Sequence, residues 1–254
     1  MAVVGAEFKA AIRQFKGGLP GPGNFYPWQH RNGNRIGSKI VDVDKIEQPI
    51  LWYFADPMCS WCWGFSPVIA RVKEEYGDRI RLSLNLGGLR PGASPPMAET
   101  QRQEILHHWQ QVNRLTGQPF QFENALPDGF IYNTEPPSRA TLVVGRLQPK
   151  QTLKYFSAVH AAFYQHGQDV TQNDVLASIA GGFGVGEDEF NALFESEEMR
   201  EMTQQHFRRT RQAGVHGFPT TVLQAGENVE LLASGYAPFE QIASAIDRQL
   251  AVME

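Results

Sequence analysis

The chain has 254 residues, of which 42% are hydrophobic and 20% are charged, as in ordinary globular proteins, and this length allows one large domain or two smaller ones. A net charge of −4 provides no basic surface for nucleic acid, which excludes that class of partner. No apolar run approaches the ~20 residues that a membrane helix needs, so we expect no membrane association.

The first 46 residues differ in composition from the rest of the chain. Residues 5–16 are compatible with a short helix, and residues 17–37 are rich in Gly, Pro and Asn, which is typical of loops. We interpret residues 1–46 as an N-terminal extension that is largely loop. The segment lacks the ~7–15 residue apolar stretch of a secretory signal, and we therefore expect a cytoplasmic protein.

A strand–helix–strand unit follows this extension. Residues 50–56 form a short apolar run rich in β-formers, which predicts a buried strand. The pattern then becomes helical from about Ser60 to near Gly77, and Pro67 is expected to kink that helix. Residues 80–88 alternate apolar and polar side chains, which predicts a second strand.

Helical periodicity dominates the middle of the chain. The pattern predicts helices over residues 97–116, 136–147, 150–166, 172–182 and 187–212. Asn133 or Thr134 is expected to cap the second of these helices. Thr171 or Asn173 is expected to cap the fourth. Arg139, on the second helix, is a candidate to reach the cysteines described below.

β structure returns near the end of the chain. Residues 217–224 and 229–234 are predicted strands, and residues 238–252 a closing helix. The order β-α-β, helical block, β-β-α predicts an α/β fold, with one mixed sheet and an inserted all-helical domain. We accordingly divide the chain into the extension at 1–46, a first half of the fold at 47–93, the inserted helical domain at 94–213 and a second half at 214–254.

The only two cysteines, Cys59 and Cys62, lie within the stretch ADPMCSWCWGF at residues 55–65. A structural zinc site needs four ligands and no second cysteine pair exists. Nothing in the sequence places His206 or His216 near the cysteines, so we expect no metal. A static disulfide is also disfavoured, because closing so short a loop removes little chain entropy and the compartment is expected to be reducing.

The remaining use of this spacing is dithiol–disulfide chemistry. It needs one reactive thiolate and a second thiol that resolves a mixed disulfide. Cys59 falls just past a strand end and at the mouth of a helix, where free backbone N–H groups and the helix dipole stabilise a thiolate. Cys62 falls inside the first helical turn. We therefore expect Cys59 to be the solvent-accessible nucleophile and Cys62 the buried resolving thiol.

Several residues near the cysteines are candidates for supporting roles. Pro219 opens an apolar strand although it has no backbone donor, and the aromatic Phe218 before it favours a cis peptide bond. Trp61 is expected at the surface, as a contact for unfolded substrates, and Trp63 in the core. Asp56 has two possible roles, capping the helix or transferring the proton of the second cysteine, and we favour capping.

The stretch DPMCSWCWGFSP resembles the active-site motif of the DsbA-like thioredoxin-fold superfamily, in particular its predicted protein-disulfide isomerases and FrnE-like branch. The segment YNTEPPSRA at residues 132–140 is similar to the same branch. The resemblance covers residues 50–254 and implies a thioredoxin-like sheet with an inserted helical domain. It also implies that Cys59 attacks, that Cys62 resolves, and that Pro219 is a cis proline facing them. The Ser-Trp pair between the cysteines, where periplasmic DsbA proteins carry Pro-His, indicates a less oxidising couple.

Three functions are weighed on these grounds. The first is a thiol–disulfide oxidoreductase or protein disulfide isomerase that acts on cysteine-containing proteins or peptides, with Phe218 and Trp61 as substrate contacts. It needs no bound cofactor beyond its redox-active disulfide, and glutathione could serve as external thiol donor. The second is a kappa-class glutathione transferase or a hydroxychromene-carboxylate isomerase, which generally lack a CxxC pair. The third is a binding module with vestigial cysteines.

Overall fold

The computed structural model describes residues 48–226 and 228–251, so the helix and loop that we expect within residues 1–46 lie outside the described part of the chain. Four strands form one sheet: β1 Ile50–Ala55, β2 Arg81–Leu86, β3 Thr220–Ala225 and β4 Asn228–Ser234. Their order is β2-β1-β3-β4, with β1 and β2 parallel and the other two pairs antiparallel. The prediction of a mixed sheet is therefore confirmed.

β1 is the strand that carries the chain to the cysteines. All six of its residues are buried, and it pairs with a neighbour along each edge. At its middle, Tyr53 lies between Leu84 of β2 and Thr221 of β3. A strand in this position has no solvent-facing side, which explains its uninterrupted apolar sequence.

Helix α3, Ser60–Tyr76, begins at the cysteine motif and runs through Pro67 as one helix. Proline has no N–H, so the carbonyl of Trp63, four residues earlier, loses its helical partner. The Ser66 hydroxyl donates to this carbonyl at 2.8 Å, and the side-chain amide of Gln118 donates to it at 3.0 Å. These two hydrogen bonds replace the missing one, and the second joins α3 to the loop that contains Gln118.

The other helices of the described chain are α4 Glu99–Thr116, α5 Glu135–Leu147, α6 Thr152–Tyr164, α7 Asn173–Gly181, α8 Glu187–Phe194, α9 Glu197–Gln212 and α10 Phe239–Ala251, with a 3-10 turn at Pro149–Gln151 before α6. The single helix predicted over residues 187–212 is wrong, because the structure has two, α8 and α9. Ser196 starts the second one. Its side chain accepts a hydrogen bond from the N–H of Met199 at 3.2 Å, which is an N-cap arrangement.

The predicted caps of α5 and α7 are only partly right. Asn133 accepts the N–H of Glu135 at 3.1 Å and so caps the start of α5. Thr134 occupies the N-cap position, as one of the two alternatives predicts, but its hydroxyl makes no capping bond. It instead accepts the N–H of Arg90 at 3.1 Å, which joins α5 to the loop after β2. At α7 the N-cap position falls on Gln172, without a side-chain cap, rather than on either expected residue.

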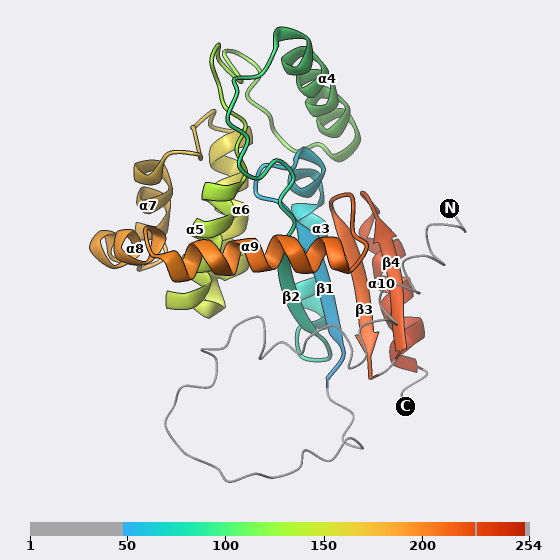
Figure 1. Ribbon diagram of the computed structural model, residues 1–254. Helices are drawn as coiled ribbons and strands as arrows, with labels where there is room; N and C mark the ends of the chain where they lie inside the picture. Colours follow the sequence, from blue (N-terminus) through green and yellow to red (C-terminus); the bar gives the residue numbers. More distant parts are fainter. Residues whose placement is uncertain (1–47, 227, 252–254) are drawn as a thin grey trace.

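The helices cover both faces of the sheet. α3 and α10, which contact each other, lie behind the sheet in Figure 1, and α9 crosses its front. The Thr210 hydroxyl of α9 donates to the carbonyl of Leu86 at 3.1 Å, which anchors α9 at the end of β2. α5, α6, α7 and α8 pack together beside the sheet (Figure 1). Within the described residues, no helix combines the length and apolar character needed to cross a membrane.

Candidate active site

Cys59 is the N-cap residue of α3, and its sulfur takes the place of a capping oxygen. Its backbone is extended, and its N–H donates to the carbonyl of Asp56 at 3.1 Å. Its sulfur accepts the N–H of Cys62 at 3.3 Å. The other free N–H groups of the first turn and the positive end of the helix dipole lie at the same end of the helix. A thiolate at Cys59 is therefore stabilised by α3 itself.

The two thiols differ less in exposure than the sequence predicts. Cys62 is fully buried, as expected, but Cys59 exposes only 5% of its surface, so the expectation of an accessible Cys59 is wrong. The loop before β3 contacts this sulfur, since the Cys59 thiol donates to the carbonyl of Phe218 at 3.5 Å. Burial raises the pKa of the Cys62 thiol well above its usual value, and the neighbouring Cys59 raises it further. Both cysteines are free thiols in this structure.

The loop before β3 comes from far along the chain and faces Cys59. Its Phe218–Pro219 peptide bond is cis, as the sequence predicts. The Pro219 carbonyl accepts the N–H of Gly235 at 2.7 Å, which anchors the loop to the chain just after β4. The Phe218 ring packs directly over Gly87, where a Cβ atom would lie 2.1 Å from the ring. The loop that contacts the Cys59 sulfur is thus held by two other segments, at Gly87 and at Gly235.

Asp56 lies fully buried just after β1. One of its carboxylate oxygens accepts the N–H of Met58 at 2.9 Å, and the other accepts the N–H of Leu89 at 2.7 Å. Asp56 therefore fixes the turn before α3 instead of capping the helix, a role that Cys59 takes, so the expected capping role is wrong. Burial raises the pKa of the Asp56 carboxyl to about 6, against the lowering effect of its two N–H donors. After burial and Cys59, the charge of Asp56 also raises the pKa of the Cys62 thiol.

Side chains of the helical insertion hold the same turn from another side. The Tyr132 hydroxyl donates to the carbonyl of Met58 at 2.5 Å and lies 3.3 Å from the hydroxyl of Tyr164. His160 of α6 donates from Nε2 to the carbonyl of Asp56 at 3.0 Å. The sequence does not predict these three contacts, because none of them joins neighbouring residues. Two of them link the insertion to the turn before α3, across 74 and 104 residues, and the third links two residues of the insertion across 32 residues. The one available signal is that Tyr132 opens the segment YNTEPPSRA.

The family model of the DSBA-like thioredoxin domain matches residues 50–247. This chain belongs to that family. A candidate protein disulfide isomerase from Nitrosomonas europaea is 41% identical, with a TM-score of 0.77 over 82% of this chain and 100% of the other. The cytosolic disulfide reductase DsbM from Pseudomonas aeruginosa is 26% identical, with a TM-score of 0.67 over 80% of this chain and 99% of that one. The expected DsbA-like thioredoxin fold with a helical insertion is confirmed.

A more distant relative carries a different description. The ClpXP adapter protein SpxH of Halalkalibacterium halodurans is 23% identical over 203 residues, which cover 77% of this chain. The matched region spans 66% of the length of that relative. The DSBA-like thioredoxin fold is thus shared with proteins whose names state disulfide chemistry and with one whose name states an adapter role.

The two tryptophans of the motif occupy different environments in this DSBA-like domain. Trp63 is a core residue, as predicted, with 7% of its surface exposed, and its indole N–H donates to the carbonyl of Pro119 at 2.9 Å. Trp61 is half-buried, and its ring centroid lies 6.4 Å from that of Tyr236. Trp61, which stands between the two cysteines in the sequence, is therefore partly rather than fully exposed at the surface.

Arg139 does not reach the cysteines of the DSBA-like domain. It is buried within the helical insertion and pairs with Glu135 at 3.1 Å. Its guanidinium also donates to the carbonyl of Phe194 at 2.7 Å and stacks over the ring of the same residue. Arg139 therefore joins α5 to the end of α8, and the candidate role at the active site is wrong.

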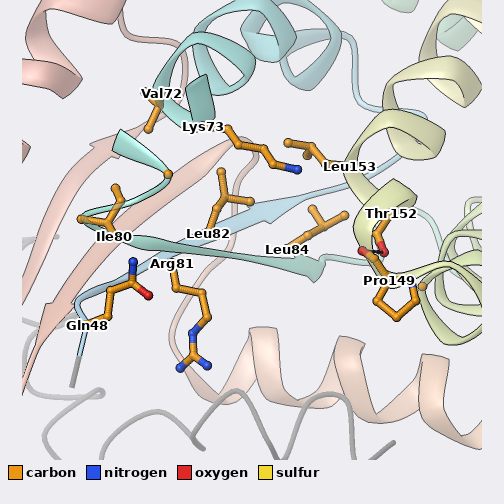
Figure 2. A pocket seen from close by; sticks show the side chains of 12 residues that line it. Gln48, Val72, Lys73, Ile80, Arg81, Leu82, Leu84, Pro149, Thr152 and Leu153 are labelled. Carbon is orange, nitrogen blue, oxygen red and sulfur yellow. Dashed lines mark hydrogen bonds between the residues drawn. The ribbon is translucent and has the colours of Figure 1, made fainter. Parts of the chain in front are cut away.

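A cavity of about 230 Å³ lies at the opposite end of the sheet, beside the first residues of β2. Figure 2 shows the Lys73 side chain reaching across this cavity toward Leu153, above Leu82 of β2. Neither cysteine lines it, so it is separate from the dithiol of this DSBA-like domain. In the part of the chain that the structure describes, no group of three His, Cys, Asp or Glu side chains is placed to hold a metal ion.

Buried titratable groups predict how the stability of this DSBA-like domain depends on pH. Burial lowers the pKa of His160 to about 4 and that of His206 to about 3. Below pH ~6.5 the unfolded chain binds protons at these histidines and the folded chain does not, so each lowers the free energy of unfolding by about 2 kcal/mol between pH 7 and pH 5. The contribution of Asp56 to the free energy of unfolding has the opposite sign. Because its pKa is higher in the folded chain, it adds about 1 kcal/mol to that free energy between pH 7 and pH 5.

We therefore expect the free energy of unfolding to fall by about 3 kcal/mol from pH 7 to pH 5, as measured by chemical denaturation. In the His160→Gln protein the side-chain amide keeps a donor for the Asp56 carbonyl and does not titrate. Its free energy of unfolding is expected to fall by about 2 kcal/mol less than that of the wild type. An identical pH dependence in both proteins would contradict the assignment of His160 as a buried neutral histidine.

Proposed function

We propose that the chain is a thiol–disulfide oxidoreductase that acts on cysteine-containing proteins or peptides. The observation that carries the proposal is the N-cap position of the Cys59 sulfur, which accepts the N–H of Cys62 at 3.3 Å. This arrangement stabilises one thiolate through the helix and keeps a second, fully buried thiol one helical turn away. A nucleophile and a resolving thiol are what dithiol–disulfide exchange requires.

The reaction proceeds in two displacements. The Cys59 thiolate attacks one sulfur of a substrate disulfide, the substrate S–S bond breaks, and half of the substrate leaves as a thiolate that takes up a proton. Cys62 then loses its proton, its sulfur attacks the Cys59 sulfur, and the second substrate thiolate leaves. Two electrons pass from the protein dithiol to the substrate, and the protein is left with a Cys59–Cys62 disulfide. An external thiol such as glutathione restores the dithiol.

Asp56 supports the second displacement as proton acceptor. Its carboxyl has a pKa of about 6 and is therefore mainly ionised at neutral pH. It acts electrostatically on the Cys62 thiol, and its position is fixed by the N–H groups of Met58 and Leu89. Of the two roles that the sequence leaves to Asp56, proton transfer is the one that agrees with these contacts.

The substrate binds beside the loop before β3. An extended peptide can pair with the backbone at Phe218, whose carbonyl already lies 3.5 Å from the Cys59 sulfur. The partly exposed ring of Trp61 supplies an apolar contact on the other side of the cysteine pair. We further propose that the protein works in the cytoplasm, which agrees with the name of the Pseudomonas aeruginosa relative, a cytosolic disulfide reductase.

A redox titration tests the proposal. The protein is equilibrated at pH 7 in glutathione buffers of graded potential, and its free thiols are counted by alkylation after acid quenching. We expect one two-electron transition, with a midpoint more negative than the about −120 mV of DsbA, because Trp61 brings no positive charge to the thiolate. Cysteines that stay unlinked at every potential would contradict the proposal.

The second candidate function is that of a non-catalytic adapter, favoured by the name of the Halalkalibacterium halodurans relative. An adapter does not need a defined couple, so the same titration separates the two. The alternative of a kappa-class glutathione transferase or a hydroxychromene-carboxylate isomerase is not preferred, because such enzymes generally lack a CxxC pair and Cys62 would have no role.

A further inference from the structure

Tyr53 lies at the centre of β1, the strand that leads to the cysteine pair. It is completely buried, and its ring is held between Phe65 of α3, with centroids 5.8 Å apart, and Phe156 of α6, with centroids 6.2 Å apart. Strand pairing with β2 and β3 fixes its backbone on both sides. The Tyr53 hydroxyl therefore has a fixed position in the core.

This buried hydroxyl has no hydrogen-bond partner among the described residues, while the Cys62 thiol is near enough to act on it electrostatically. A buried hydroxyl without a nitrogen or oxygen partner is costly, and folded proteins retain few of them. Burial raises the pKa of Tyr53 well above its usual value, and Cys62 and Cys59 raise it further. The hydroxyl thus keeps its proton and remains a buried hydrogen-bond donor without a partner in the part of the chain that the structure describes.

We propose that the Tyr53 hydroxyl donates a hydrogen bond to the Cys62 sulfur and stabilises its thiolate while it attacks the mixed disulfide. This rests on the proposed oxidoreductase function. Cys59 receives such help from the N-terminus of α3, but Cys62 lies inside the helix and is buried. In a low-dielectric interior a thiolate without a donor is strongly disfavoured. A backbone hydrogen bond from Asp56 already lowers the pKa of the Cys62 thiol, and Tyr53 supplies a second donor from the sheet.

The groups around the two sulfurs have separate roles in the second displacement. Cys59, Asp56 and Tyr53 are the titratable groups that act on the Cys62 thiol, and His160 of α6 bonds to the backbone of Asp56. The Cys62 proton passes to the Asp56 carboxylate. The electron pair left on Cys62 forms the bond to the Cys59 sulfur, and the bond from Cys59 to the substrate sulfur breaks with its electron pair on the substrate. Tyr53 keeps its proton throughout.

The proposal assigns Tyr53 to the second displacement alone, and this separates it from a structural role. Tyr53→Phe keeps the ring and its packing and removes only the hydroxyl. We expect attack by Cys59 to be unchanged and attack by Cys62 to slow about tenfold at neutral pH, the effect of one hydrogen bond to a charged group. The pH profile of the second displacement should move to higher pH.

An aromatic disulfide reagent that releases a coloured thiolate resolves the two steps in stopped flow. The reduced full-length protein releases a first equivalent when Cys59 attacks and a second when Cys62 displaces the bound half. The rates of both phases are measured from pH 5 to pH 9 for the wild type, Tyr53→Phe and Tyr155→Phe. Tyr155 is a matched control, because it is equally buried and its hydroxyl donates to the Leu176 carbonyl at 3.0 Å, within the helical insertion.

The outcomes separate this inference from the function on which it rests. Release of only one equivalent by the wild type would contradict the oxidoreductase function itself. Two equivalents from the wild type, with the same second-phase rate and pH profile in Tyr53→Phe, would overturn the role of Tyr53 alone. Slowing of both phases in Tyr53→Phe, or equal slowing in Tyr155→Phe, would overturn it as well, because such effects come from general loss of packing.

Discussion

The Cys59→Ser protein is expected to reduce no disulfide in a turnover assay with insulin and an external thiol, whereas the Cys62→Ser protein is expected to stop after one step. A serine hydroxyl at the N-cap is a good helix cap, so Cys59→Ser should fold normally and lose only the nucleophile. In Cys62→Ser the first displacement proceeds and the mixed disulfide persists, because no second thiol displaces it. Cys59→Ser is therefore expected to block the first displacement, and Cys62→Ser only the second.

Mass spectrometry after a single exposure to oxidised glutathione distinguishes these outcomes. Cys62→Ser should carry one glutathione on Cys59, the wild type should show an internal disulfide, and Cys59→Ser should carry none. Thermal unfolding of all three proteins provides the control for folding. Full turnover by Cys59→Ser, or glutathione on Cys62 in that protein, would show that the roles of the two thiols are reversed.

The local features of the site could be predicted from the sequence. The apolar run of β1, the helix after it and the cysteine spacing are all short-range patterns, and they place Cys59 at the start of α3. The closing strands and helix follow from the same kind of pattern. The cis peptide bond before Pro219 could also be predicted, from the order of the motifs along the chain.

What could not be predicted depends on contacts between distant segments. The contact between the Cys59 thiol and the carbonyl of Phe218 joins residues 159 positions apart in the chain. The bond between Asp56 and Leu89 spans 33 residues, so the sequence alone favoured a local cap. The break between α8 and α9 depends on one serine in a charged run whose helical pattern continues past it. Propensity and periodicity do not contain this information.

The site lies where the helical insertion contacts the turn after β1, and this gives the insertion a role in the chemistry. His160 and Tyr132 of the insertion bond to the carbonyls of Asp56 and Met58, so they fix the turn that ends at Cys59. A shift of the insertion relative to the sheet would therefore move the nucleophile and the proposed proton acceptor together.

Gly87→Ala is expected to slow the reaction of Cys59 about 10- to 100-fold while lowering the free energy of unfolding by only about 1–3 kcal/mol. A Cβ at this position would lie 2.1 Å from Cζ and 2.3 Å from Cε1 of Phe218, a separation that real atoms do not adopt. The Phe218 ring is half-buried and can swing outward, which limits the loss of stability. Its backbone would move with it, and the Phe218 carbonyl lies 3.5 Å from the Cys59 sulfur.

A double-mutant cycle with Phe218→Ala tests this cause directly. Without the ring, the added methyl group meets no obstacle, so Gly87→Ala should have little further effect in the Phe218→Ala background. Gly181→Ala is the matched control, because a Cβ there has no atom within 4 Å and α7 is remote from the cysteines. Stopped-flow attack of Cys59 on an aromatic disulfide measures the rate, and denaturant unfolding measures the stability. Equal slowing by Gly87→Ala with and without the Phe218 ring would contradict the idea that this ring and Gly87 together position the loop against Cys59.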